Sequence, residues 1–160
     1  MFVNDASTGG ITANHFSLAS TTAPVSTLAD FTAGSKGDVL DISALMAKNA
    51  SGFLHDLNAN PAASTAYNKD ILLLNDYKNQ GLGTVSGLQT ALGGSGEYSH
   101  VNLSAPGQTI LITTETATPT VADVYYETTA SGGHETVTLV GVMDFTGHGN
   151  INALVAGNFV

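Results

Sequence analysis

The chain of 160 residues contains no cysteine. This absence excludes a disulfide framework, a cysteine-ligated zinc site and a thiol nucleophile. A single domain is the expectation for this length, because a chain of this size can bury roughly 70% of its unfolded surface. The protein therefore does not need covalent cross-links or an oligomeric partner in order to fold.

Positive charge is scarce as well. The sequence has four lysines, no arginine and 13 acidic residues, which gives a formal net charge of −9. Binding to nucleic acid, or to an anionic membrane surface, needs clustered Lys or Arg side chains, so we expect no nucleic-acid partner. An acidic chain without arginine suits divalent cations, and calcium prefers oxygen ligands.

Long hydrophobic runs are missing. The run ILLL at 71–74 is far too short to span a bilayer, so we expect no membrane insertion. The first ten residues, MFVNDASTGG, lack the basic start and the apolar stretch of a Sec signal. Charged residues make up only 11% of the chain, and Thr, Ser, Asn, Gly and Ala take their place. This composition is typical of extracellular β proteins and surface layers, which predicts an extracellular location.

Short segments of alternating polarity predict a mainly β fold, with a β-roll-end or β-sandwich-like body and one or two short helices. Two glycines at 132–133 separate two such segments and favour a β-hairpin. We expect one domain over 1–160, in which 1–45 form a roll-like lead-in and junction and 46–160 form a C-terminal β body. The expected strands are 15–20, 25–31, 38–43, 70–77, 97–103, 108–115, 121–128 and 135–145. A short helix is expected at 84–92, and either one short helix or two turns at 44–57.

Catalytic motifs are not recognisable in the sequence. None of the five histidines belongs to an H-x-x-x-H or H-E-x-x-H pair, and Glu97 stands where a G-x-S-x-G motif starting at Gly93 needs its last glycine. We therefore predict that the protein is not an enzyme. Some of the tyrosines could form a sugar-binding platform, although strand-face or core positions are the ordinary role of such residues. The candidates are Tyr77, Tyr98, Tyr125 and Tyr126.

The most informative acidic segment is ADFTAGSKGDVLDISAL at 29–45, in which Asp30, Asp38 and Asp41 surround a glycine-bearing turn. A glycine-flanked Asp at the start of a strand can place its carboxylate beside free backbone carbonyls, as in the stacked calcium-binding turns of parallel β-rolls. A single turn of this kind needs a neighbouring turn to complete a site. Two hypotheses follow: these three residues are calcium ligands, or they cap turns.

This segment resembles the one that follows the last calcium-binding repeat in RTX proteins exported by type I secretion. The Asp30-Phe31 pair, the glycine-bearing loop and the strand DVLDISAL at 38–45 match that pattern in order. The segment VADVYYETTASGGHETVTLVGV at 121–142 resembles the hairpin near the end of such proteins, and NALVAGNFV at 152–160 is similar to the terminus that the exporter reads. The chain contains no complete nonapeptide repeat.

The resemblance implies a non-catalytic C-terminal module of a secreted RTX-type protein at the bacterial cell surface. Its partners would be the type I exporter and either further copies of itself in a surface layer or a cell-surface matrix. Asn158, Phe159 and Val160 would form the secretion signal, the domain would act as a folding cap, and Ca²⁺ outside the cell would favour the folded state. Two alternatives remain: a calcium-assisted adhesin or carbohydrate-binding module, and an accessory domain of a secreted hydrolase.

Overall fold

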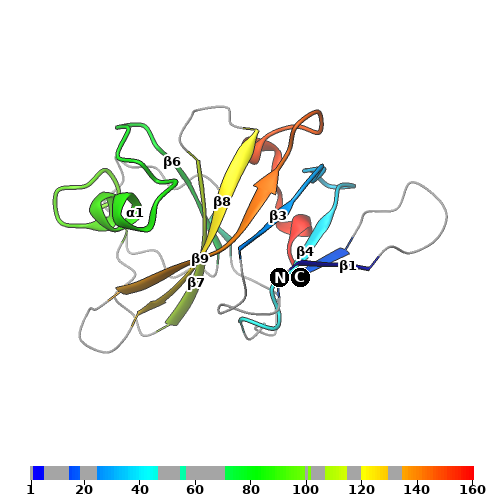
Figure 1. Ribbon diagram of the computed structural model, residues 1–160, viewed down its shortest axis with the longest axis horizontal. Coiled ribbons are helices and arrows are strands. Elements are labelled where there is room, and N and C mark those ends of the chain that lie inside the picture. Colours follow the sequence, from blue (N-terminus) through cyan, green and yellow to red (C-terminus); the bar gives the residue numbers. More distant parts are fainter. Residues whose placement is uncertain are drawn as a thin grey trace.

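Two β-sheets form the framework of the protein in the computed structural model (Figure 1), which describes residues 2–5, 15–18, 25–46, 55–56, 71–99, 101, 107–114, 120–129 and 135–160. The smaller sheet has the order β1 (Phe2–Asp5), β2 (His15–Leu18) and β4 (Val39–Asp41). The larger sheet has the order β3 (Ser26–Leu28), β9 (Glu135–Asp144), β8 (Val121–Thr129), β7 (Gly107–Thr114), β6 (Ile71–Asn75) and β5 (His55–Asp56).

The larger sheet is buried on both faces, and this creates two cores. Leu72 and Leu74 of β6 pack with Leu88 and Leu92 of the helix α1 (Val85–Leu92) on one face. The alternate residues of β6 point to the opposite face and pack against β2 and β4 of the smaller sheet. Figure 1 shows α1 and the smaller sheet on opposite sides of the larger sheet. The continuous apolar run of β6 follows from this position, since a strand covered on both faces does not alternate with polar residues.

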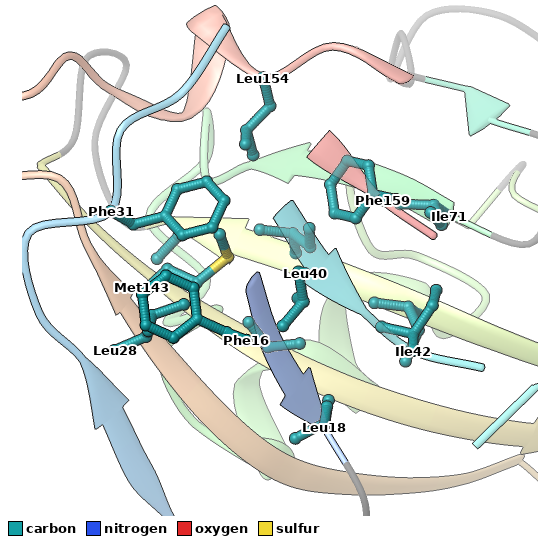
Figure 2. Close-up of a cluster of buried hydrophobic side chains, with 14 of the residues drawn as sticks. Phe16, Leu18, Leu28, Phe31, Leu40, Ile42, Ile71, Met143, Leu154 and Phe159 are labelled. Carbon is teal, nitrogen blue, oxygen red and sulfur yellow. The ribbon is translucent and has the colours of Figure 1, made fainter. Parts of the chain in front are cut away.

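Aromatic rings occupy the core between the two sheets. The ring of Phe31 lies 6.1 Å from that of Phe16 and 5.8 Å from that of Phe145, the latter in an edge-to-face arrangement. Figure 2 shows Phe16, Phe31 and Met143 together at one side of this cluster. Phe31 thereby joins the segment after β3 to the smaller sheet and to the end of β9.

The predicted mainly β, sandwich-like fold is confirmed, as are several of its parts. The glycine-rich segment joins β8 and β9, which pair antiparallel with a bulge between Val124 and Tyr125. The helix predicted over 84–92 is α1, with Thr84 as its N-cap and Gly93 as its C-cap. Two short 3-10 helices follow β9, η1 (Ile151–Ala153) and η2 (Ala156–Asn158).

Two local predictions were wrong where the structure describes them. Residues 97–99 form a turn and not a strand, because the backbone N–H of Glu97 is bonded to the Gln80 side chain rather than to a neighbouring strand. The segment 44–57 was predicted as one short helix or two turns; its first residues form a turn, whereas 55–56 belong to β5, which pairs with the first two residues of β6. Residues 47–54 and 57 of that prediction lie outside the described residues.

The predicted division at residue 45 does not coincide with a division between the sheets. β2 and β4 belong to the smaller sheet, whereas β3 pairs in parallel with β9 in the larger one. The lead-in is therefore shared between both sheets, and the organisation as a single domain stays a prediction.

Candidate functional site

The junction loop, residues 30–38, links β3 to β4 and is closed by its own hydrogen bonds. The backbone N–H of Thr32 donates to Oδ2 of Asp38 at 2.8 Å, and the N–H of Asp38 donates to the carbonyl of Thr32 at 2.7 Å. Asp38 is only 3% exposed. Its carboxylate therefore holds the two ends of the loop together, which is the turn-capping role that the sequence left open.

Glycine is required at Gly37 because the loop closes tightly there. A Cβ atom at this position would lie 2.1 Å from the carbonyl oxygen of Thr32, well inside van der Waals contact. Gly34 has a φ of +114°, a backbone conformation that residues with a side chain rarely adopt. The two glycines thus allow a loop of this size to return to the start of β4.

Asn158 fastens the C-terminal segment to the junction loop, and we call this arrangement the C-terminal latch. Its Nδ2 group donates to the carbonyls of Gly34 at 3.0 Å and Asp38 at 2.7 Å. Its Oδ1 atom accepts from the N–H of Gly34 at 3.1 Å and from that of Val155 at 2.9 Å. The side chain is fully buried, and these four bonds use the complete donor and acceptor capacity of a primary amide.

The two residues after Asn158 extend the smaller sheet. Phe159 forms a parallel bridge with Leu40 of β4, and the carbonyl of Val160 accepts from the N–H of Ile42 at 2.9 Å. Figure 2 shows the Phe159 ring beside Leu40 and Ile71 in the core between the sheets. The predicted secretion signal therefore lies against the predicted calcium segment, although more than 110 residues separate them in the sequence.

The three candidate calcium ligands have different surroundings. Asp30 is exposed and has a left-handed backbone, with a φ of 58°. Asp38 is buried in the junction loop, and Oδ1 of Asp41 accepts from the N–H of Ser43 at 2.9 Å. Within the described ranges no three His, Asp or Glu side chains are placed to hold one metal ion. Calcium binding by these residues stays a prediction.

The tyrosines do not share one surface. Tyr98 and Tyr125 are fully buried in the core beneath α1. Tyr77 is 58% exposed in the turn after β6, and Tyr126 is half-buried on β8 against the other core. A joint platform of the four tyrosines is therefore excluded by the burial of two of them.

A second polar cluster was not foreseen from the sequence, and we call it the α1 clasp: Asp76, Gln80 and Glu97. Asp76 accepts the backbone N–H groups of the turn before the helix, at 2.6 Å from Gln80 and 2.8 Å from Gly81. Glu97, in the turn after the helix, accepts the N–H of Lys78 at 2.8 Å. Its own N–H donates to Oε1 of Gln80 at 2.7 Å. The only sequence signal was the position of both acids beside glycine-rich turns.

The comparisons with protein-family models, with curated proteins and with solved structures gave no match for this chain. Across the described residues, none of the helices is long and apolar enough to cross a membrane. The function must therefore be argued from the arrangement of the two polar clusters and from the sequence.

Proposed function

We propose that this chain is the non-catalytic C-terminal module of a secreted RTX-type surface protein, exported by a type I system and acting outside the bacterial cell. The observation that carries the proposal is the C-terminal latch. Asn158 is fully buried and Phe159 is 4% exposed, so both side chains are accessible only before folding. This fits an address that the exporter reads on the unfolded chain and that folding outside the cell then conceals.

The latch also gives the proposed folding cap a physical basis. The segment Asn158–Val160 adds to the edge of β4, and the unpaired backbone groups of an exposed edge strand invite pairing with other chains. Covering this edge only after the last residues have left the exporter would couple the end of export to the completion of the smaller sheet.

Export is tested with a reporter fused in front of the whole chain in a strain that carries a type I exporter. Removal of residues 158–160 is expected to keep the reporter inside the cell. The matched control is Leu73→Ala, which removes a buried core side chain and leaves the terminus intact. This control is expected to be exported, because the exporter takes unfolded chains. Secretion of the truncated fusion at the level of the full one would contradict the proposal.

Calcium is proposed as an external ligand of the junction segment through Asp30, Asp38 and Asp41. Because Asp38 is already engaged in the loop, Asp30 and Asp41 would supply the accessible oxygens, together with ligands from a neighbouring turn. Calcium at 100 times its dissociation constant would stabilise the fold by about 2.7 kcal/mol. A thermal unfolding scan with 5 mM CaCl₂ and with EDTA checks this, and an unchanged melting temperature would remove calcium from the proposal. Light scattering after calcium addition tests assembly into a layer.

A further inference from the structure

Each of the two turns that flank α1 carries a buried carboxyl group. Asp76 stands directly after β6 and Glu97 follows the turn that ends the helix. Glu97 is 2% exposed and Asp76 is buried as well. Both groups bond to the turn before the helix, where Asp76 accepts from Gln80 and Gly81 and Glu97 accepts from Lys78. Two ionised carboxylates offer acceptors only, so a bond between them would require a proton.

The hydrogen bonds of the two carboxyl groups indicate which of them would carry such a proton. The oxygens of Asp76 accept three backbone N–H groups, those of Gln80, Gly81 and Leu82, so both of its oxygens have donors. In Glu97 only Oε2 accepts an N–H group, from Lys78, while Oε1 is buried with no donor among the described residues. A proton on Oε1 would remove this deficit and supply the donor that the pair needs.

We propose that Glu97 carries a proton on Oε1 in the folded domain, and that this proton closes the α1 clasp as a pH-sensitive fastening of the helix to the larger sheet. The proton passes to solvent when the clasp opens, and no other bond changes. The device is independent of the secretion proposal, since it concerns the stability of the folded domain.

The packing around the clasp explains why its closure matters for the fold. The hydroxyl of Tyr98, the residue after Glu97, donates to the carbonyl of Asn75 at 2.6 Å and accepts the N–H of Asn75 at 2.9 Å. Gly87 of α1 lies against the carbonyl of Gly81, where an added Cβ would come within 1.9 Å. Loss of the clasp would therefore loosen both the turn that supports the helix and the tyrosine that fills the core beneath it.

The groups that face Glu97 mostly oppose its ionisation. Burial raises the pKa of Glu97 above the ordinary value of 4.5, and the charge and hydrogen bond of Asp76 raise the pKa further. The backbone N–H of Lys78, and more weakly its ammonium group, act in the opposite direction. Burial, followed by the charge of Glu97, raises the pKa of Tyr98, with smaller contributions from Tyr77 and Asp76 in the same direction. Tyr98 therefore stays neutral where Glu97 titrates.

The sign of the pH effect follows from this direction. Below pH 4.5 the carboxyl of Glu97 is protonated in both the folded and the unfolded chain, so the contribution of the clasp is fully present. As the pH rises from there to the folded pKa, unfolding releases one proton, and the folding equilibrium constant falls by about tenfold per pH unit. Above the pKa that Glu97 has in the folded protein, its carboxyl is ionised in both the folded and the unfolded chain, and the contribution of the clasp to stability is lost completely.

The test compares the wild-type protein with Glu97→Gln between pH 4 and 8.5. The glutamine amide has the shape of the protonated acid, can donate to Asp76 through Nε2 and can accept from Lys78 through Oε1. We expect wild-type stability to fall relative to the variant as the pH rises, with the largest gap at the alkaline end. Parallel profiles for the two proteins would overturn the proposal.

Asp144→Asn is the matched control with the opposite sign. Hydrogen bonds from the Thr146 side chain and backbone lower the pKa of Asp144, so its contribution is present at neutral pH and is lost as the pH falls. This substitution should change how stability depends on pH only at acidic pH, and the decrease in stability at alkaline pH should be the same as in the wild type. An altered decrease at alkaline pH in Asp144→Asn would also count against assigning that decrease to Glu97.

Two further measurements keep the proposal testable if Glu97→Gln folds poorly. The ¹³C shift of the Glu97 carboxyl in the wild-type protein reports its protonation directly, and a titration near pH 4.5 would overturn the proposal. Calcium titration distinguishes a proton from a cation at this position. A rise in melting temperature with CaCl₂ at pH 7.5 that Glu97→Gln abolishes would show that the carboxyl pair holds a cation instead.

Discussion

The C-terminal latch and the α1 clasp solve the same problem with different chemistry. Each fastens a segment without regular sheet pairing to the end of a strand, and each buries the polar atoms that do so. The latch uses the amide of Asn158, whose two donors and two acceptor positions all have partners. The clasp uses two carboxyl groups, which offer acceptors only when ionised, and Oε1 of Glu97 has no donor among the described residues.

The difference lies in what each fastening depends on. An amide does not titrate in the physiological range, so the latch holds the C-terminal segment at any pH at which the domain is folded. The clasp holds α1 firmly only while Glu97 carries its proton. The smaller sheet is therefore fastened unconditionally, whereas the helical side of the larger sheet responds to pH.

The largest effect is expected from breaking the latch with Asn158→Ala. The substitution removes four hydrogen bonds and leaves the N–H groups of Gly34 and Val155 without their Asn158 partner in a mostly buried setting, while the Gly34 carbonyl keeps the N–H of Gly37. The loss should cost about 3 kcal/mol of the free energy of unfolding. Urea denaturation monitored by circular dichroism measures this loss. Because the amide is neutral, the loss should be the same at pH 5 and pH 8.

Ser35→Ala is the control for this prediction, since Ser35 is an exposed residue of the junction loop. It should change the free energy of unfolding by less than about 0.5 kcal/mol. Equal losses in Ser35→Ala and Asn158→Ala would mean that the buried hydrogen bonds of Asn158 are not what holds the tail.

Elements of the fold that depend on neighbouring residues could be predicted from the sequence. The β8–β9 hairpin, the apolar strand β6 and the helix α1 rest on neighbouring residues, and local patterns predicted each of them. Turn capping by Asp38 was one of two hypotheses from the sequence, and it could be foreseen because the partner Thr32 lies only six residues away. The sequence also marked Asn158, through the resemblance of the closing segment.

Partners distant in the chain could not be predicted. The bonds from Asn158 to Gly34 span 124 residues, and those from Glu97 to Lys78 and Gln80 span 19 and 17. A sequence shows which side chains can form hydrogen bonds but not which backbone groups the fold will bring to them. Glu97 was therefore assigned to a strand, because its neighbours Tyr98 and Val101 have strand propensity and the turn depends on contacts before the helix.

The smallest effect is expected from the helix cap beside the clasp. Oγ1 of Thr84 accepts the N–H of Gly87 at 3.1 Å, and Thr84→Ala should lower the free energy of unfolding by about 1 kcal/mol. Thr84→Ser keeps the hydroxyl and should stay within a few tenths of the wild type. The cap carries no charge. The decrease in the free energy of unfolding caused by Thr84→Ala should therefore be the same at pH 5 and pH 8, as long as the substitution does not change how far the clasp is closed.

A dependence on pH in Thr84→Ala would mean that the cap and the clasp are coupled. The same hydroxyl donates to the carbonyl of Gly81, whose N–H is held by Asp76, so a physical route for such coupling exists. The double variant Thr84→Ala with Glu97→Gln measures it. If the two substitutions change the free energy of unfolding additively, the pH response resides in the carboxyl pair alone. If their effects are not additive at pH 8, the part of the fold that responds to pH includes the first turn of α1 as well as the two turns.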